Sequence, residues 1–148
     1  MRRGTTLIEL LIVLAMIGTL TAIAVPRTAD LLAGVAVEGA AQRLAAAHAV
    51  ARLTAVMRGA PTFLIVSPES LTVFIVRGAD TSVAWRAPGP DGDGVTIVGP
   101  SRRVAFGSNG IARGVSNATF TLTRRRSVRQ VVISRLGRVR IARGTLEN

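Results

Sequence analysis

One carboxylate lies inside a long apolar run near the N-terminus. From Leu7 to Val25 the sequence has nineteen residues, and Glu9 is the only charged one. This length is close to the ~20 residues that a helix needs to cross a bilayer. A carboxylate at mid-membrane costs roughly 2.5–3.5 kcal/mol on insertion scales, so Glu9 calls for a positive partner. The run itself holds no cation, so that partner must come from another chain or from a newly made N-terminus.

Arginine is the second chemically informative residue type, and it is concentrated in the last third of the chain. Residues 5–99 carry six arginines against seven acids, whereas residues 100–148 carry eleven arginines against Glu147 alone. A basic region joined to a nearly neutral one suggests a polyanionic partner, either nucleic acid or anionic lipid. The alternative is that the use of arginine without lysine reflects a GC-rich genome, and that the basic region binds no partner.

The most specific basic pattern is Gly137-Arg138-Val139-Arg140. If Val139 and Ile141 are buried on one side of a strand, Arg138 and Arg140 must face solvent on the other. Their backbone positions are then roughly 6.5–7 Å apart, close to the phosphate repeat of a nucleic-acid strand. Gly137 permits a tight turn and a close approach of a phosphate to the backbone. The pattern predicts backbone-directed, salt-sensitive DNA binding.

Further arginines can enlarge this predicted patch. Arg143 follows on the same segment, and Arg124, Arg125 and Arg126 fall between two predicted strands, at a loop tip. The competing interpretation is that exposed strand positions carry charge only to block edge-to-edge aggregation. No aromatic residue lies near the patch, which argues against sequence-specific reading of single strands.

Other chemistry has little support in the sequence. Cysteine is absent, which excludes thiol chemistry, disulfides and cysteine-based metal sites. His48 has no second ligand at a suitable spacing, and Asp91 and Asp93 lack the further oxygen ligands of a calcium loop. We therefore predict no catalytic residue, no metal site, no cofactor and no enzymatic activity.

The N-terminal segment allows two interpretations. A basic start (Arg2, Arg3) before an apolar stretch is typical of a secretory signal peptide, and Ala22-Ile23-Ala24 would serve as its cleavage site. The run is long for a signal peptide, however, and it contains Glu9. As a membrane anchor, it would place the N-terminus in the cytoplasm and the remainder outside, because positive residues stay inside.

The elements that must position these residues follow from periodicity. Residues 27–58 are rich in alanine and lack turn signals, which predicts that the helix continues beyond the apolar run. Its sheet-packing face is predicted to be a stripe of residues at spacings of three, four and seven: Leu32, Val35, Gly39, Ala46, Val50, Leu53 and Met57.

Gly59-Ala60-Pro61 predicts the end of that helix. The rest of the chain has short β-rich runs between turn residues, which predicts an antiparallel sheet. The expected strands are 62–66, 71–76, 82–86, 95–98, 103–106, 118–123, 128–134 and 138–142. The first two form a hairpin around residues 67–70, and residues 87–94 form a loop. The fold class is therefore α+β, with a long N-terminal helix packed on a C-terminal sheet domain.

The residues Gly4-Thr5-Thr6-Leu7-Ile8-Glu9-Leu10-Leu11 resemble the processing motif of type IV pilins and type II secretion pseudopilins. The resemblance implies that a prepilin peptidase cuts between Gly4 and Thr5 and methylates the new amine of Thr5. It also implies that Glu9 pairs with the N-terminus of a neighbouring subunit during filament assembly. Pro26 matches the usual helix kink of the family, although Thr5 departs from its common Phe or Met.

Gly137-Arg138-Val139-Arg140 resembles a C-terminal motif of the GspH/FimT subgroup. In FimT-type members it is associated with capture of extracellular DNA in natural transformation. GspH-type pseudopilins, which lie near the tip of a type II secretion pseudopilus and have no DNA role, carry similar endings. Both alternatives stay open from the sequence.

Together the two resemblances imply a bacterial inner-membrane protein with a single pass and a periplasmic or extracellular C-terminal domain. The expected segments are a leader (1–4), a transmembrane and filament-core helix (5–26), its amphipathic continuation (27–58) and a β-sheet domain (59–148). Its expected partners are other pilins or pseudopilins, the prepilin peptidase, the inner membrane and double-stranded DNA.

Overall fold

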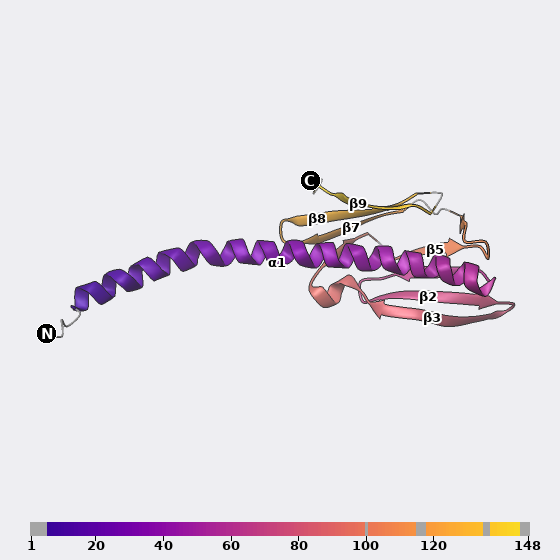
Figure 1. Ribbon diagram of the computed structural model, residues 1–148, viewed down its shortest axis with the longest axis horizontal. Coiled ribbons are helices and arrows are strands. Elements are labelled where there is room, and N and C mark those ends of the chain that lie inside the picture. The colour runs from indigo at the N-terminus through magenta and orange to yellow at the C-terminus, as the bar shows by residue number, and fades with distance from the viewer. Residues whose placement is uncertain (1–5, 100, 115–117, 135–136, 146–148) are drawn as a thin grey trace. The chain divides into compact units, whose positions relative to one another are not determined.

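The computed structural model describes residues 6–99, 101–114, 118–134 and 137–145. Within them, a long helix is followed by strands and a short 3-10 helix, η1 (Figure 1). The elements are α1 (Leu7–Arg58), β1 (Thr62–Val66), β2 (Ser70–Arg77), β3 (Asp80–Pro88), η1 (Pro90–Asp93), β4 (Thr96–Val98), β5 (Arg102–Phe106), β6 (Ala112–Arg113), β7 (Ala118–Arg124), β8 (Ser127–Ile133) and β9 (Val139–Arg143).

Helix α1 has local signals at both ends. Thr6 precedes its first residue, and the Thr6 hydroxyl accepts a hydrogen bond from the backbone N–H of Glu9 at 3.3 Å. This is the N-cap half of a capping box, Thr-x-x-Glu. At the other end Gly59 has a φ of 58°, a left-handed conformation that favours glycine, and the chain leaves the helix there. The helix continues through Pro26 without interruption.

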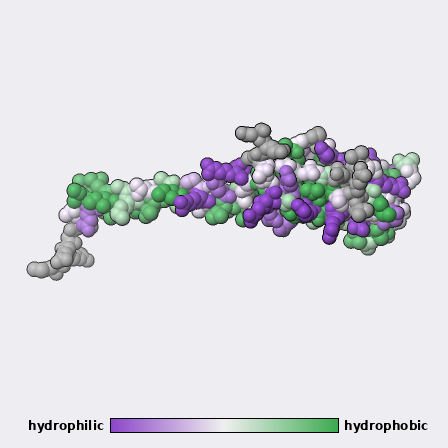
Figure 2. Space-filling model, turned by 90° about the horizontal axis from the view of Figure 1, so that it is seen from above, coloured by the Kyte–Doolittle hydropathy of each residue, from purple (hydrophilic) through white to green (hydrophobic). Residues whose placement is uncertain are grey.

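The chain divides into two compact units, residues 1–32 and 33–148. In the first unit, residues 6–28 are all exposed, and the stretch after Thr6 is mostly hydrophobic in colour in Figure 2. Among the described residues, α1 alone is long and apolar enough to cross a membrane, and its most apolar window has no buried residue.

The described residues of the second unit form two antiparallel sheets. Sheet A has the order β3-β2-β1-β5-β6, and sheet B has the order β4-β7-β8-β9. The predicted first hairpin is confirmed, because β1 pairs with β2 and Val66 lies opposite Leu71. All eight predicted strands occur, with ends within two residues of those expected. The two-residue β6 and η1 were not predicted, because neither is long enough to show a period.

One hydrophobic core joins α1 to both sheets. It includes Leu44 of the helix, Phe106 of sheet A and Phe120 of sheet B, all nearly inaccessible to solvent. The hydroxyl of buried Thr62 donates a hydrogen bond to the carbonyl of Ala51 at 2.8 Å and so links β1 directly to the helix. Because every buried residue lies at or after Ala33, the second unit contains the whole core of the described chain.

The predicted packing face of the helix is wrong. Leu32, Val35 and Met57 are 66%, 72% and 74% exposed, while Gly39 and Val50 are only partly buried and Ala46 and Leu53 are exposed. The buried stripe consists mainly of alanines: Ala33, Val37, Ala40, Ala41, Leu44, Ala47, His48, Ala51 and Ala55. Small side chains let the helix backbone approach the sheets closely, so the packing face carries little hydrophobic bulk for a sequence pattern to detect.

Candidate functional site

The N-terminal candidate site centres on Glu9, in the first turn of α1. The Glu9 side chain is exposed, and its carboxylate makes no hydrogen bond or ion pair with any residue that the structure describes. Its position at the start of the helix is favourable for a negative charge. The carboxylate is thus presented on the outside of an apolar helix, where a second chain can reach it. Gly4 and Thr5, the predicted cleavage and methylation residues, lie outside the described residues.

The C-terminal candidate site is built on β9, the last strand of sheet B and one of its two edges. Val139 lies opposite Ile133 of β8, and Ile141 lies opposite Val131. These four side chains face the core, where Val131 and Ile133 are fully buried. Because successive strand residues alternate between faces, Arg140 lies on the opposite face. Arg138 directly precedes the strand, and both arginines are exposed.

Ser134 fixes the turn that precedes these arginines. Its backbone N–H donates to the carbonyl of Arg138 at 2.9 Å, and its hydroxyl accepts from the N–H of Arg138 at 3.1 Å. Gly137 donates to the carbonyl of Ser134 at 2.9 Å and has a φ of 73°, which favours glycine there. Our sequence reasoning missed Ser134, although a serine before a turn is a recognised signal. The turn holds the backbone of Arg138 in place while its guanidinium remains exposed.

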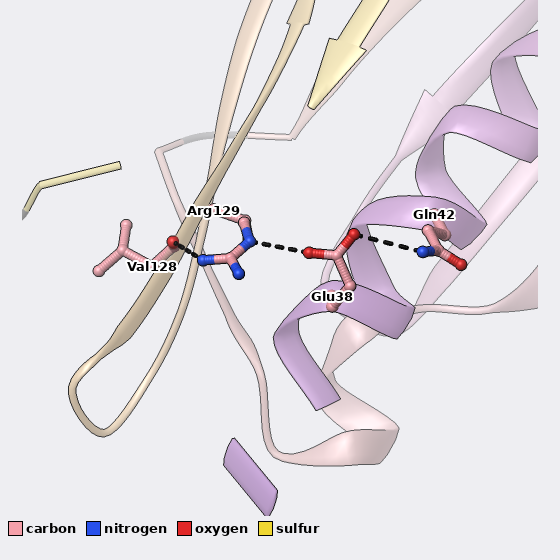
Figure 3. Close-up of polar contacts among 4 residues, drawn as sticks. All are labelled: Glu38, Gln42, Val128 and Arg129. Atoms are coloured by element: carbon pink, nitrogen blue, oxygen red, sulfur yellow. Dashed lines mark hydrogen bonds and ion pairs between the residues drawn. The ribbon is translucent and has the colours of Figure 1, made fainter. Parts of the chain in front are cut away.

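Arg143 does not share the face of Arg138 and Arg140. It lies opposite Arg129 in the β8–β9 register, and both are in phase with the core-facing Ile141. The Nε of Arg129 donates to the Glu38 carboxylate of α1 at 2.8 Å, and the Gln42 amide donates to the same carboxylate at 3.2 Å (Figure 3). The hydrogen bond from Arg129 and that from Gln42 together lower the pKa of Glu38. This face therefore uses arginine to join the sheet to the helix.

The three consecutive arginines lie at the other end of the hairpin from Gly137. Arg124 ends β7 and Ser127 begins β8, whereas Gly137 follows the far end of β8. The guanidinium of Arg124 donates to the carbonyl of Asp93 at 2.6 Å, and the Asp93 carboxylate is paired with Arg43 of α1. Arg124 thus anchors η1 and does not extend the patch. Arg125, in the turn itself, has a φ of 54°.

His48 is the one buried histidine in the chain and lies on the packing face of α1. It is 2% exposed, its ring meets that of Phe106 edge-on at 5.0 Å, and its Nε2 makes no hydrogen bond within the described part of the chain. Burial, together with a smaller effect of the charge of Arg52, lowers the pKa of His48 to about 4. His48 is therefore a neutral core residue at pH 7. The described residues hold no group of three or more potential metal ligands.

The arrangement on β9 suits one kind of chemistry. Two guanidinium groups project from one face of an edge strand, roughly 6.5–7 Å apart at the backbone, beside Val132 and Ser134. Each can donate charge-assisted hydrogen bonds to a phosphate. The residues that line this surface include no aromatic side chain on which a base could stack. Such a site would contact the backbone of a nucleic acid and not its bases.

Comparison with known proteins gives one family and one fold. Residues 40–137, more than half of the chain, match the model of the family described as type II transport protein GspH. A crystal structure of the type IV minor pilin FimU from Pseudomonas aeruginosa (strain PAO1) has 18% sequence identity and a TM-score of 0.59, and the match covers 72% of this chain and 87% of that one. A second crystal form gives 18% identity, a TM-score of 0.56, and coverages of 71% and 91%. No curated protein matches the chain significantly.

Proposed function

Because this chain belongs to the GspH family, whose members are structural pilins and pseudopilins and not enzymes, we propose that it is a minor pilin whose Arg138 and Arg140 bind DNA non-specifically. The single observation that carries this proposal is the exposure of both guanidinium groups on one face of the edge strand β9. Family and fold imply assembly with other pilins, and the long apolar helix fits a membrane-anchored component. DNA uptake in natural transformation is the role that such a site would serve.

The N-terminal part of the proposal concerns processing and assembly. A prepilin peptidase removes residues 1–4 and methylates Thr5, residues 5–26 cross the inner membrane from a cytoplasmic N-terminus, and residues 27–58 lead to the external sheet domain (59–148). Glu9 then pairs with the α-amine of a neighbouring subunit, which supplies the cation that a carboxylate in an apolar environment needs. The carboxylate of Glu9, which is exposed and pairs with no described residue, supports this role.

Mass spectrometry of the membrane-isolated protein tests the processing step. A mature chain that begins at Thr5, heavier by one methyl group, agrees with the proposal. A chain that begins at Val25 identifies the segment as a secretory signal peptide and contradicts it. Glu9→Gln should be cleaved normally and yet be missing from sheared filaments.

The alternative is a GspH-type tip pseudopilin of a type II secretion system without a DNA role. The affinity for DNA distinguishes the two functions. It is measured with the Asp30–Asn148 fragment, which contains every buried residue of the described chain. The charge-matched control is Arg58→Ala/Arg77→Ala, which removes two exposed arginines that are distant from β9 in the sequence. A DNA site on β9 predicts much weaker binding for Arg138→Ala/Arg140→Ala than for the control. Equal losses in both variants would favour the pseudopilin.

A further inference from the structure

Strand β3 (Asp80–Pro88) presents a free edge. It is the terminal strand of sheet A, paired with β2 on one side and with no described strand on the other, and it is the outermost strand of that sheet in Figure 1. Asp80 through Ala84 are all exposed, and Val83 is 51% exposed. The five residues 81–85 carry no charge. Edge strands commonly carry charged residues that prevent pairing with another strand, and this stretch carries none.

The hairpin register shows which backbone groups point outward. Gly78 and Ala79 form a two-residue turn, and Arg77 lies opposite Asp80. That pair is hydrogen-bonded in such a hairpin, so the next pairs alternate between bonded and non-bonded. Thr81 and Val83 fall at the non-bonded positions, before the irregularity at Ala84. Their N–H and C=O groups therefore point away from β2, toward the free edge.

A groove runs beside this edge, between β3 and the last turns of α1. It has a volume of about 380 Å³ and is lined by Thr54, Met57, Arg58, Ile75, Arg77, Ser82, Val83 and Ala84. Its apolar part is supplied mainly by Met57 and Ile75. Arg58 and Arg77 are both exposed, and neither makes a hydrogen bond or ion pair in the described ranges. Asp80 is the single acid of β3, so the groove has a net positive charge.

We propose that β3 accepts an extended, acidic segment of a partner protein as an additional strand of sheet A. The outward backbone groups of Thr81 and Val83 would form the ladder, and alternate apolar side chains of the partner would enter the groove. A carboxylate of the partner near the β2–β3 turn would pair with Arg58 and Arg77. This surface is separate from β9, so the proposal does not depend on DNA binding.

A second copy of this chain fits the edge less well. Two β3 strands related by a two-fold axis must pair antiparallel, because an isologous contact repeats the same surface on both copies. That pairing brings Arg86 of one strand toward the turn end of the other, where Arg58 and Arg77 outnumber Asp80, so positive charge accumulates there. Charge complementarity therefore favours an acidic partner.

Peptide binding to the full chain in detergent micelles tests this inference. The probe is an acetylated heptapeptide of alternating Thr and Val that ends in two Glu, and its control ends in two Lys. Trp85 lies on β3 and is the only tryptophan of the chain, so its fluorescence reports on occupancy. We expect saturable binding of the Glu peptide and at least tenfold weaker binding of the Lys peptide.

Two changes remove the ladder in different ways. Val83→Pro deletes an N–H that points to the free edge, where proline is tolerated in a sheet, and Val83→Thr is its matched control. N-methylation of alternate peptide residues blocks the same hydrogen bonds without any change in the protein. Each should weaken binding at least tenfold, whereas Val83→Thr should not. The N-methylated peptide decides the matter if Val83→Pro fails to fold.

Charge reversal gives a third readout. Arg58→Glu/Arg77→Glu should invert the preference, so that the Lys peptide binds more tightly than the Glu peptide. The inference is overturned if the Glu peptide causes no saturable change in Trp85 fluorescence. It is equally overturned if N-methylation leaves affinity unchanged, or if the two peptides bind the wild-type chain equally.

Discussion

The carboxylate of Glu38 on α1 accepts a hydrogen bond from the Nε of Arg129 on β8 at 2.8 Å (Figure 3). This contact joins residues 91 positions apart and fastens sheet B to the helix. It also separates the C-terminal arginines by role. Arg129 faces the helix and is neutralised there, whereas Arg138 and Arg140 lie on the other face and are exposed. The basic character of the region thus serves both architecture and surface chemistry.

Glu38→Gln should lower the free energy of unfolding by about 1 kcal/mol or less, because both partners are partly exposed to solvent. The pKa of Glu38 is below its usual value of 4.5, so its contribution is fully present above that pH and is lost as pH falls through the lowered pKa. Urea unfolding at pH 7 and pH 3 measures this. The matched control is Glu69→Gln in the exposed β1–β2 turn, and a loss as large in that variant would contradict the assignment.

Ala47→Leu tests the alanine packing face. Ala47 is fully buried against the sheets, whereas its neighbour Ala46 is exposed. Extra methylenes in a packed core cost about 1–3 kcal/mol, so Ala47→Leu should lower stability by that amount while Ala46→Leu leaves it nearly unchanged. Thermal unfolding of the Asp30–Asn148 fragment measures both variants. Equal stabilities of the two variants would contradict the alanine packing face and favour the stripe predicted from the sequence.

His48 should make folding sensitive to mild acid. The pKa of His48 is lowered from 6.5 to about 4, so the unfolded chain binds the proton first. Stability from this group is complete above about pH 6.5 and falls by about 3 kcal/mol between pH 6.5 and 4. His48→Leu should remove that part of the pH dependence, measured by urea unfolding across the range. An unchanged slope in His48→Leu would show that other groups cause it.

Gly89→Ala should disrupt the start of η1. A Cβ at Gly89 would lie 2.1 Å from the carbonyl oxygen of Pro68 and 2.5 Å from the backbone nitrogen of Ser70. Backbone must therefore move, and we expect a cost at the upper end of the 1–3 kcal/mol typical of overpacking. Gly92→Ala in the same turn meets nothing within 4 Å and is the control. Thermal unfolding that ranks the two variants equally would be inconsistent with this contact.

The sequence predicted the strands well because two signals coincide in them. Apolar residues alternate within each strand, and turn residues lie at its two ends, as in Thr62–Val66 and the β8–β9 pair. The helix face was missed because alanine contributes little to a hydrophobic pattern, although it packs most closely. That Arg143 lies on the other face from Arg138 and Arg140 could have been predicted, because it is two residues after the core-facing Ile141. The contact between Arg129 and Glu38 has no local signal, because only the tertiary fold brings them together.

The salt dependence of DNA binding tests the central claim that Arg138 and Arg140 form a phosphate-binding pair. Each phosphate contact contributes about 0.9 to the slope of log affinity against log salt. For the Asp30–Asn148 fragment with duplex DNA, Arg138→Ala/Arg140→Ala should therefore lower the slope by roughly 1.8. The charge-matched variant Arg58→Ala/Arg77→Ala should leave the slope close to that of the wild type. A wild-type fragment that does not bind DNA at low salt, or equal slopes for all three proteins, would contradict the claim.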